Sequence, residues 1–312
     1  MDSLLIGLAV LLSFLFGWNN SSLLIGNLRG AGSLSFRSAM LTSVIGLLLG
    51  VLLEGSKMVG TLGGSLAPNP TSAVLLATVL VSVVLSLGLT LLDLPVSFSM
   101  IVVAAFLGAA FSTGLPVSAG RSADVVGFWF AAPLATAAIA FAVYRSAARV
   151  VPRFGILTVD SLNRAGAVVS GLAVSYTLGA NNIGLLYESA GVTSVGQQVD
   201  LGVMLLLVVA AVAGVVTLGR NALGGTIGDR MLTLSPQGVF SAFISSSLVV
   251  WAGTQLALPI SITQCILGGM LGVAYSRVFS AVNGRLAGET LSLWVVAPLV
   301  AFALSYVLTS YL

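Results

Sequence analysis

Two short polar stretches interrupt an otherwise apolar chain and contain the residues best suited to chemistry. "GWNNSS" at 17–22 and "GANNIG" at 179–184 each place two side-chain amides beside a glycine, with no charged residue among them. Within lipid, a break in a helix is tolerated only where the freed polar groups face protein or a watery cavity. We therefore expect a cavity lined by the polar residues of these stretches: Asn19, Asn20, Ser21, Asn181 and Asn182.

A second pair of motifs predicts two helix starts. "LPVSFSM" at 94–100 and "LPISITQ" at 258–264 place a proline just before hydroxyl residues, which is typical of a helix N-terminus. Such an end offers unpaired backbone N–H groups and the positive end of the helix dipole, so it suits a tetrahedral oxyanion. The side chains that would add donors are Ser97, Ser99, Ser261, Thr263 and Gln264. The structural alternative is that the amides join helices and that Pro-Ser caps two buried ones.

The composition determines the class of protein that must hold these residues. Of 312 residues, 58% are hydrophobic and only 7% are charged, whereas soluble domains contain about 25% charged residues. The basic residues are scattered singly, which argues against nucleic-acid binding. With so few charged residues, we expect the chain to lie in a lipid bilayer. There is no histidine and one cysteine, Cys265. We therefore expect neither an enzyme nor a metal site, and no cofactor apart from Na⁺ as a coupling ion.

Hydropathy divides the chain into ten apolar segments of roughly the ~20 residues that span a bilayer. The first five lie near 4–32 (broken at the polar stretch), 38–54, 73–92, 94–111 and 124–144. The second five lie near 165–189 (also broken), 199–218, 237–257, 258–276 and 290–311.

The two sets of segments repeat the same motifs at a nearly constant offset. The Gly-x-Asn-Asn motifs are 162 positions apart, the Leu-Pro-x-Ser motifs 164, and Trp129 and Pro133 recur after 165 positions as Trp294 and Pro298. This predicts an all-α polytopic membrane protein made of two repeats, residues 1–145 and 165–312, joined by a cytoplasmic linker at 146–164. Five spans per repeat would invert the second copy, with the broken helices at the repeat interface.

The basic residues favour ten full crossings. If every segment crosses, ten arginines lie on one side and only Lys57 and Arg121 on the other, whereas treating the two Leu-Pro-x-Ser segments as re-entrant removes this bias. The positive-inside rule then places both termini outside and the linker in the cytoplasm, in a plasma-membrane protein.

With these motifs, the chain resembles the inorganic phosphate transporter (PiT) family over nearly its whole length. That family has Gly-Ala-Asn-Asp in each half, Pro-Val-Ser-Thr-Thr-His after a later span, and Trp-x-x-x-Pro in each last span. Here the corresponding stretches are "GWNN" and "GANN", "LPVSFSM" and "LPISITQ", and "WFAAP" and "WVVAP". The resemblance implies an anion permease with inverted repeats, usually driven by sodium or protons, and a homodimer.

The chain departs from the family pattern at the positions expected to bind ions. The family aspartates fall on Asn20 and Asn182, and the family asparagine further along falls on Leu23 and Leu185. Both family histidines are replaced, by Met100 and Gln264. Asn20 and Asn182 are therefore our candidates for the coupling ion, although an amide oxygen ligates Na⁺ with a weaker field than a carboxylate. A site without carboxylates would also tolerate sulfate, which has no proton to donate.

The expected function is secondary-active transport of phosphate, with sulfate as a close alternative, by alternating access coupled to Na⁺ or H⁺. A sulfate permease without aspartate-based sodium coupling and an anion channel are the other functions that the sequence leaves open. Among the few acidic residues near helix ends, Glu54 and Glu188 are the ones that we would mutate first.

Overall fold

The apolar segments form helices in the computed structural model, which describes residues 2–92, 94, 97–191, 199–218, 234–276 and 284–312. The helices of the first half are α1 (Asp2–Gly30), α2 (Phe36–Glu54), α3 (Ser72–Leu91), α4 (Phe98–Ser112) and α5 (Ala119–Val150). Those of the second half are α6 (Ile156–Ser189), α7 (Leu201–Leu218), α9 (Pro236–Gln255), α10 (Ile262–Ser276) and α11 (Gly284–Thr309). Two short helical turns, Gly55–Met58 and Thr61–Leu66, follow α2.

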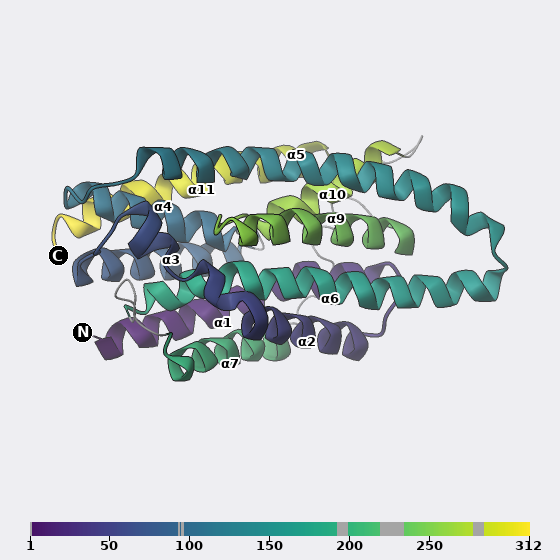
Figure 1. The fold of residues 1–312 in the computed structure, drawn as a ribbon, viewed down its shortest axis with the longest axis horizontal. Coiled ribbons are helices and arrows are strands. Elements are labelled where there is room, and N and C mark those ends of the chain that lie inside the picture. The colour runs from purple at the N-terminus through teal and green to yellow at the C-terminus, as the bar shows by residue number, and fades with distance from the viewer. Residues whose placement is uncertain (1, 93, 95–96, 192–198, 219–233, 277–283) are drawn as a thin grey trace.

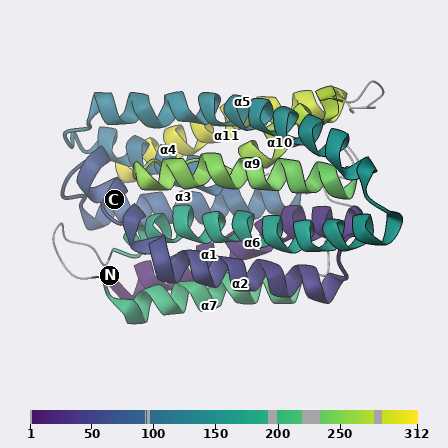
Figure 2. The ribbon, with the colours of Figure 1, turned by 45° about the vertical axis from the view of Figure 1, so that its right-hand side comes forward.

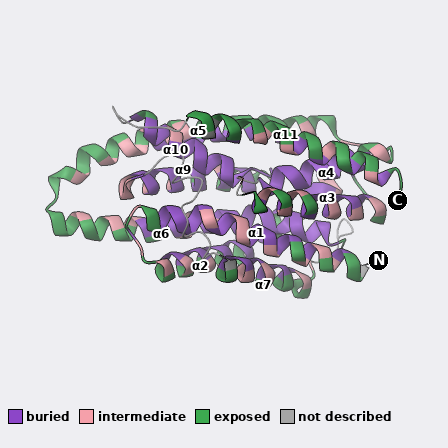
Figure 3. Ribbon diagram, turned by 180° about the vertical axis from the view of Figure 1, so that it is seen from behind, coloured by how far each residue is buried: buried purple, intermediate pink, exposed green. Residues whose placement is uncertain are grey.

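Several of these helices are long and apolar enough to cross a bilayer. Among the described residues they are α1, α2 with the turns after it, α3, α5 and α11, while α4, α7 and α10 are shorter apolar helices. The buried residues concentrate in the middle of the bundle, and the exposed ones lie along its outer faces and at its ends (Figure 3).

The prediction that α1 and α6 are broken is wrong, because both run unbroken through their polar stretches. The side chains of these stretches bond to carbonyls of their own helix. Asn20 Nδ2 donates to the Phe16 carbonyl at 2.9 Å, and Asn182 Nδ2 donates to the Leu178 carbonyl at 3.0 Å. Neither stretch contains a proline, so no backbone hydrogen bond is lost and the helix continues.

The prediction of ten full crossings is also wrong, because α3 with α4 and α9 with α10 form hairpins. The two arms of each hairpin pack against each other, and Ser99 Oγ at the start of α4 donates to the Ile260 carbonyl at the start of α10, at 3.3 Å. Ten crossings would place these two turns on opposite faces, about 30 Å apart. In Figure 1 the α3–α4 hairpin lies at the end that carries both termini, and α9 and α10 extend from the opposite end.

The charge bias could not reveal these hairpins. Each hairpin uses two of the ten segments and returns the chain to the side from which it entered, as two full crossings also do, so the basic residues divide between the two faces in the same way. The bias disappears only when a single segment of each pair is treated as re-entrant. The interruptions of helical structure within the bundle therefore lie between the two arms of each hairpin, and not within α1 or α6.

The helices of the two halves are interleaved. The helix α1 packs on α7 and α2 on α6, while α4 packs on α11 and α5 on α10. Close approach needs glycine: a Cβ at Gly50 would meet the Tyr176 carbonyl, and one at Gly214 would meet the Phe14 carbonyl. Because α1 starts at one end of the bundle and α6 at the other (Figure 1), the two halves run in opposite directions, as inverted repeats require.

Most of the predicted linker at 146–164 is helical. The helix α5 continues to Val150, a single 3₁₀ turn follows at Val151–Arg153, and α6 begins at Ile156. The helix breakers Pro152 and Gly155 lie only at the turn, so both helices extend beyond the bundle (Figure 1). The helix α9 lies between α5 and α6, which brings the second hairpin next to both of these long helices (Figure 2).

Candidate functional site

The starts of α4 and α10 meet α1 and the last third of α6 around a small cavity of about 10 Å³. Six of the predicted site residues come together there: Asn20, Ser97, Ser99, Asn182, Ser261 and Thr263. The remaining lining residues are apolar and were not predicted: Phe16, Phe98, Leu178 and Ile262.

The ten lining residues form five pairs related by the internal repeat. Phe16 and Leu178, like Asn20 and Asn182, are 162 positions apart. The three residues that begin at Ser97 pair with the three that begin at Ser261, at an offset of 164. The cavity therefore lies where the two copies face each other, and the repeat offset is the signal that could have found the apolar pairs from the sequence.

Two helix N-termini supply the electrostatics of the cavity. The first backbone N–H groups of a helix have no carbonyl partner within it and lie at the positive end of its dipole. In α10, Ser261 Oγ accepts from the Gln264 N–H at 3.2 Å, which leaves the Ser261 hydroxyl hydrogen for another acceptor. In α4, Ser97 Oγ is buried and has no hydrogen-bond partner. None of the lining residues that the structure describes carries a formal charge.

The two amides of the cavity offer acceptors as well as donors. Asn20 and Asn182 are 4% and 5% exposed, and each uses one side-chain N–H to bond to its own helix. The amide oxygen and the second N–H remain to interact with a ligand. An amide oxygen can accept a hydrogen bond from the hydroxyl of a protonated anion or ligate a small cation.

Apolar side chains close the cavity. The rings of Phe16 and Phe98 meet edge to face, with centroids 5.5 Å apart, and Leu178 and Ile262 complete the wall. A volume of about 10 Å³ corresponds to room for a single water molecule. A tetrahedral oxyanion is larger than water, so the starts of α4 and α10 must separate to admit one.

The neighbouring asparagines hold the hairpins instead of lining the cavity. Asn181 Nδ2 donates to Thr254 Oγ1 at 2.9 Å and to the Leu258 carbonyl at 3.0 Å, and its Oδ1 accepts from the Ile260 N–H at 3.0 Å. Asn19 Nδ2 donates to Thr90 Oγ1 at 3.2 Å. Adjacent residues of a helix point about 100° apart, so only one asparagine of each pair can face the cavity.

Two other predicted residues also lie outside the cavity lining. Ser21 Oγ donates to the Trp18 carbonyl of its own helix at 2.6 Å. The Gln264 side chain is buried, and its Oε1 has no hydrogen-bond partner. Its backbone N–H bonds to Ser261, so Gln264 contributes to the start of α10 without contacting the cavity.

The acidic residues Glu54 and Glu188 make structural contacts. The buried carboxylate of Glu188 accepts from the backbone N–H groups of Thr61, Leu62 and Gly63 at 2.6–3.0 Å and so ties the turn after α2 to α6. Glu54 forms an ion pair with Lys57 at 2.8 Å. Within the described part of the chain, no group of three or more His, Cys, Asp or Glu side chains could hold a metal ion.

Comparison with known proteins gives matches along the whole chain. A family model described as the phosphate transporter family matches residues 16–158 and again residues 157–305. A protein of Methanocaldococcus jannaschii named "putative phosphate permease" is 24% identical over 300 residues, which cover 95% of this chain and 93% of that protein. The phosphate-repressible phosphate permease of Neurospora crassa is 30% identical over 151 residues, 44% of this chain but only 25% of that protein.

A solved structure shares the fold. The structure titled the sodium-dependent phosphate transporter superposes with a TM-score of 0.84 and covers 99% of this chain and 98% of its own. Its sequence is 16% identical, so this similarity establishes the architecture alone. The two family-model matches meet at 157–158, next to the turn between α5 and α6, in agreement with two copies of one unit.

Proposed function

This chain belongs to the phosphate transporter family, and from that premise we propose that it carries phosphate through the cavity between the starts of α4 and α10. Its family is one of integral membrane transporters, and the chain is not an enzyme. The observation that carries the proposal is the convergence of two helix N-termini, one from each repeat, on a single uncharged cavity.

This arrangement suits a transported anion. Helix dipoles and neutral donors stabilise a dehydrated anion, and they do so without the permanent charge of an arginine. A carrier site must bind its cargo strongly enough to admit it and weakly enough to release it. Serine hydroxyls and backbone N–H groups meet both requirements.

Alternating access would follow from the repeat. The two hairpins enter from opposite ends of the bundle, and among the described residues Ser99 of one turn bonds to the Ile260 carbonyl of the other. Withdrawal of one hairpin would open the cavity to one side, and withdrawal of its counterpart would open it to the other. The closed cavity of about 10 Å³ supports the need for such movement.

Phosphate is the preferred cargo on chemical grounds. At neutral pH phosphate keeps at least one proton, so its hydroxyl can donate a hydrogen bond to the Asn20 or Asn182 oxygen. Sulfate is the second candidate, because no carboxylate is found among the described lining residues to repel an anion that has no proton. For the coupling ion we propose Na⁺ or H⁺, with the same two amide oxygens as ligands for Na⁺.

The orientation that we propose has both termini outside. Seven of the nine basic residues that the structure describes then lie on the cytoplasmic face, with the α5–α6 turn. Cysteines introduced near the termini should react with an impermeant thiol reagent in intact cells. We also propose a homodimer, and crosslinking of two chains in the same samples would report it. If the termini were labelled only in lysed cells, the orientation would be the opposite one, with both termini in the cytoplasm.

The decisive experiment is uptake into proteoliposomes. The purified protein should accumulate radiolabelled phosphate, and to a lesser extent sulfate, under an inward sodium or proton gradient. Empty liposomes and a variant with both Ser97 and Ser261 changed to alanine serve as controls. Transport of neither anion would refute the proposed function, and uptake that never saturates or never exceeds equilibrium would favour a channel.

A further inference from the structure

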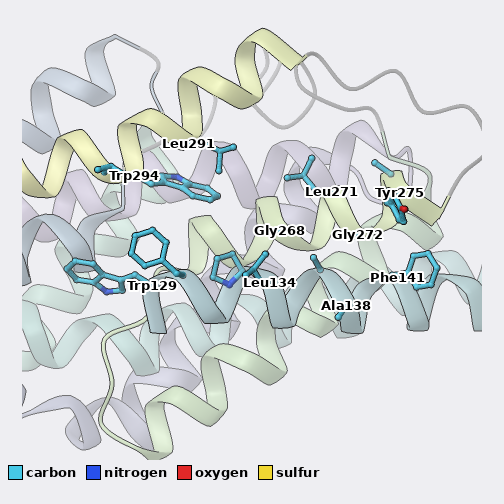
Figure 4. A pocket seen from close by; sticks show the side chains of 15 residues that line it. Trp129, Leu134, Ala138, Phe141, Gly268, Leu271, Gly272, Tyr275, Leu291 and Trp294 are labelled. Atoms are coloured by element: carbon cyan, nitrogen blue, oxygen red, sulfur yellow. The ribbon is translucent and has the colours of Figure 1, made fainter. Parts of the chain in front are cut away.

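A second and much larger hollow lies on the lateral surface of the bundle. It is a groove of about 870 Å³ between α5, α10 and α11. Figure 4 shows it extending from Trp129 and Trp294 to Phe141 and Tyr275. None of its lining residues is charged, and none is shared with the anion cavity.

The floor of this groove is rigid. Gly268 and Gly272 of α10 lie against α5 so closely that a Cβ on either would meet the carbonyl of Pro133 or Ala137. The opposite wall belongs to α11 and includes Leu291. Because α5 and α10 are already in backbone contact, they cannot move together to close the groove.

The groove opens toward the lipid. Its rim carries large exposed apolar side chains on both walls, among them Leu134 (71% exposed) and Val295 (46% exposed). In a bilayer, an apolar concavity of this size cannot hold water at low cost, so an apolar molecule must fill it.

One end of the groove has the chemistry of a lipid headgroup site. The rings of Phe141 and Tyr275 lie 6.2 Å apart, and Arg145 Cζ lies 5.7 Å from the centroid of the Phe141 ring. Tyr275 is 87% exposed, and Arg149 follows one helical turn after Arg145. No described carboxylate pairs with Arg145. An aromatic ring beside an unpaired arginine at the end of a membrane helix is suited to a phosphate headgroup.

We propose that this groove binds an anionic phospholipid, with one acyl chain along α5 and α10 and the headgroup phosphate at Arg145. A second copy of the chain fits less well. A two-fold interface centred on the groove would place groove against groove, so that two concave surfaces leave space unfilled. It would also bring the arginines at the groove mouths of the two copies toward each other, which is unfavourable.

The test uses phosphatidylglycerol with a photoreactive diazirine in its acyl chain, in liposomes that contain the full-length protein. Wild type should give crosslinked peptides from α5 and α10. Ala138→Trp places a large side chain in the groove, at an exposed position, and should lower this crosslinking several-fold. Ala135→Trp is the matched control, because Ala135 is exposed on the same helix outside the groove, and it should leave the yield unchanged.

Two further measurements test the role of the headgroup and the alternative that a second copy of the chain occupies the groove. Arg145→Gln should remove the preference for phosphatidylglycerol over phosphatidylcholine while crosslinking of the acyl chain persists. For the second copy, Tyr275→Cys supplies an exposed thiol in a chain whose one native cysteine, Cys265, is buried. Equal crosslinking in the two tryptophan variants, or efficient joining of two chains through Cys at position 275, would overturn the lipid proposal.

Discussion

The two hairpin turns share a sequence pattern, but the contacts between their described residues and the surrounding helices differ. At the second turn, Asn181 makes three hydrogen bonds, the Trp129 indole donates to the Pro259 carbonyl at 3.0 Å, and Arg121 donates to the Leu256 and Ala257 carbonyls at 2.7 and 2.6 Å. At the first turn, Asn19 bonds to Thr90, and the indole N–H of Trp294, the repeat mate of Trp129, is buried without a partner. Residues 93, 95 and 96 of the first turn lie outside the described part of the chain.

This difference does not come from the asparagine or the tryptophan, because both copies contain them. It reflects conformation, since an inverted repeat can place its two halves in unlike arrangements. The second hairpin is fixed to α5 and α6, so we expect the α3–α4 hairpin to move first when the cavity opens. The predictions below start with the largest expected effect.

The largest difference between the two hairpins is expected when Asn181→Ala is compared with Asn19→Ala. At about 1 kcal/mol for each buried hydrogen bond, loss of the three bonds of Asn181 should lower the free energy of unfolding by about 3 kcal/mol, and loss of the Asn19–Thr90 bond by about 1 kcal/mol. Thermal unfolding of the purified variants measures both. Equal losses would show that the two hairpins are anchored alike.

The serines that precede the two helices should separate binding from stability. Ser97→Ala and Ser261→Ala each remove a hydroxyl from the cavity, and together they should raise the KM for phosphate about tenfold. Only Ser261→Ala should also cost about 1 kcal/mol of stability, because Ser261 caps its helix and Ser97 does not. The control is Ser170→Ala, which changes a buried serine that has no partner and lies outside the cavity. If the KM were unchanged in the double variant, the two hydroxyls would not contribute to phosphate binding.

Changing both cavity amides to carboxylates should alter selectivity. In Asn20→Asp with Asn182→Asp, phosphate uptake should increase relative to sulfate by about tenfold, because a carboxylate accepts the phosphate proton but repels sulfate. Dependence on the cation should increase as well. Competition uptake with both anions measures the ratio, and an unchanged ratio would contradict the role assigned to the amides.

The smallest effect is expected from the two tryptophans. Trp129→Phe removes the hydrogen bond to the Pro259 carbonyl and should cost about 1 kcal/mol more stability than Trp294→Phe, whose indole N–H has no partner. Thermal unfolding of the pair gives the difference. A cost as large at Trp294 would indicate that the first hairpin is anchored in the same way.

Much of the candidate site was predictable because its residues are polar and repeated in an apolar background. Asn20, Asn182 and the hydroxyl residues at both helix starts meet as the sequence indicates. Asn19 and Asn181 were indistinguishable from their neighbours in the sequence, and their roles in holding the hairpins depend on which face of each helix turns toward the cavity. Phe16 and Leu178 were missed because apolar residues carry no signal of their own among so many others.

The sequence by itself determined that this is a duplicated, all-helical membrane protein with uncharged polar residues at matching positions. Hydropathy and repeat spacing depend only on the order of residues, and lipid forces apolar segments into helices. Only the tertiary structure decided that α1 and α6 stay whole, that the chain turns back at the Leu-Pro-x-Ser motifs, and that those turns meet. The first of these could not be read from the sequence because an asparagine can bond to a carbonyl of its own helix, so a polar stretch need not break it. The hairpins could not be read from it because a hairpin and two crossings leave the basic residues on the same faces, so packing between the repeats decides between them.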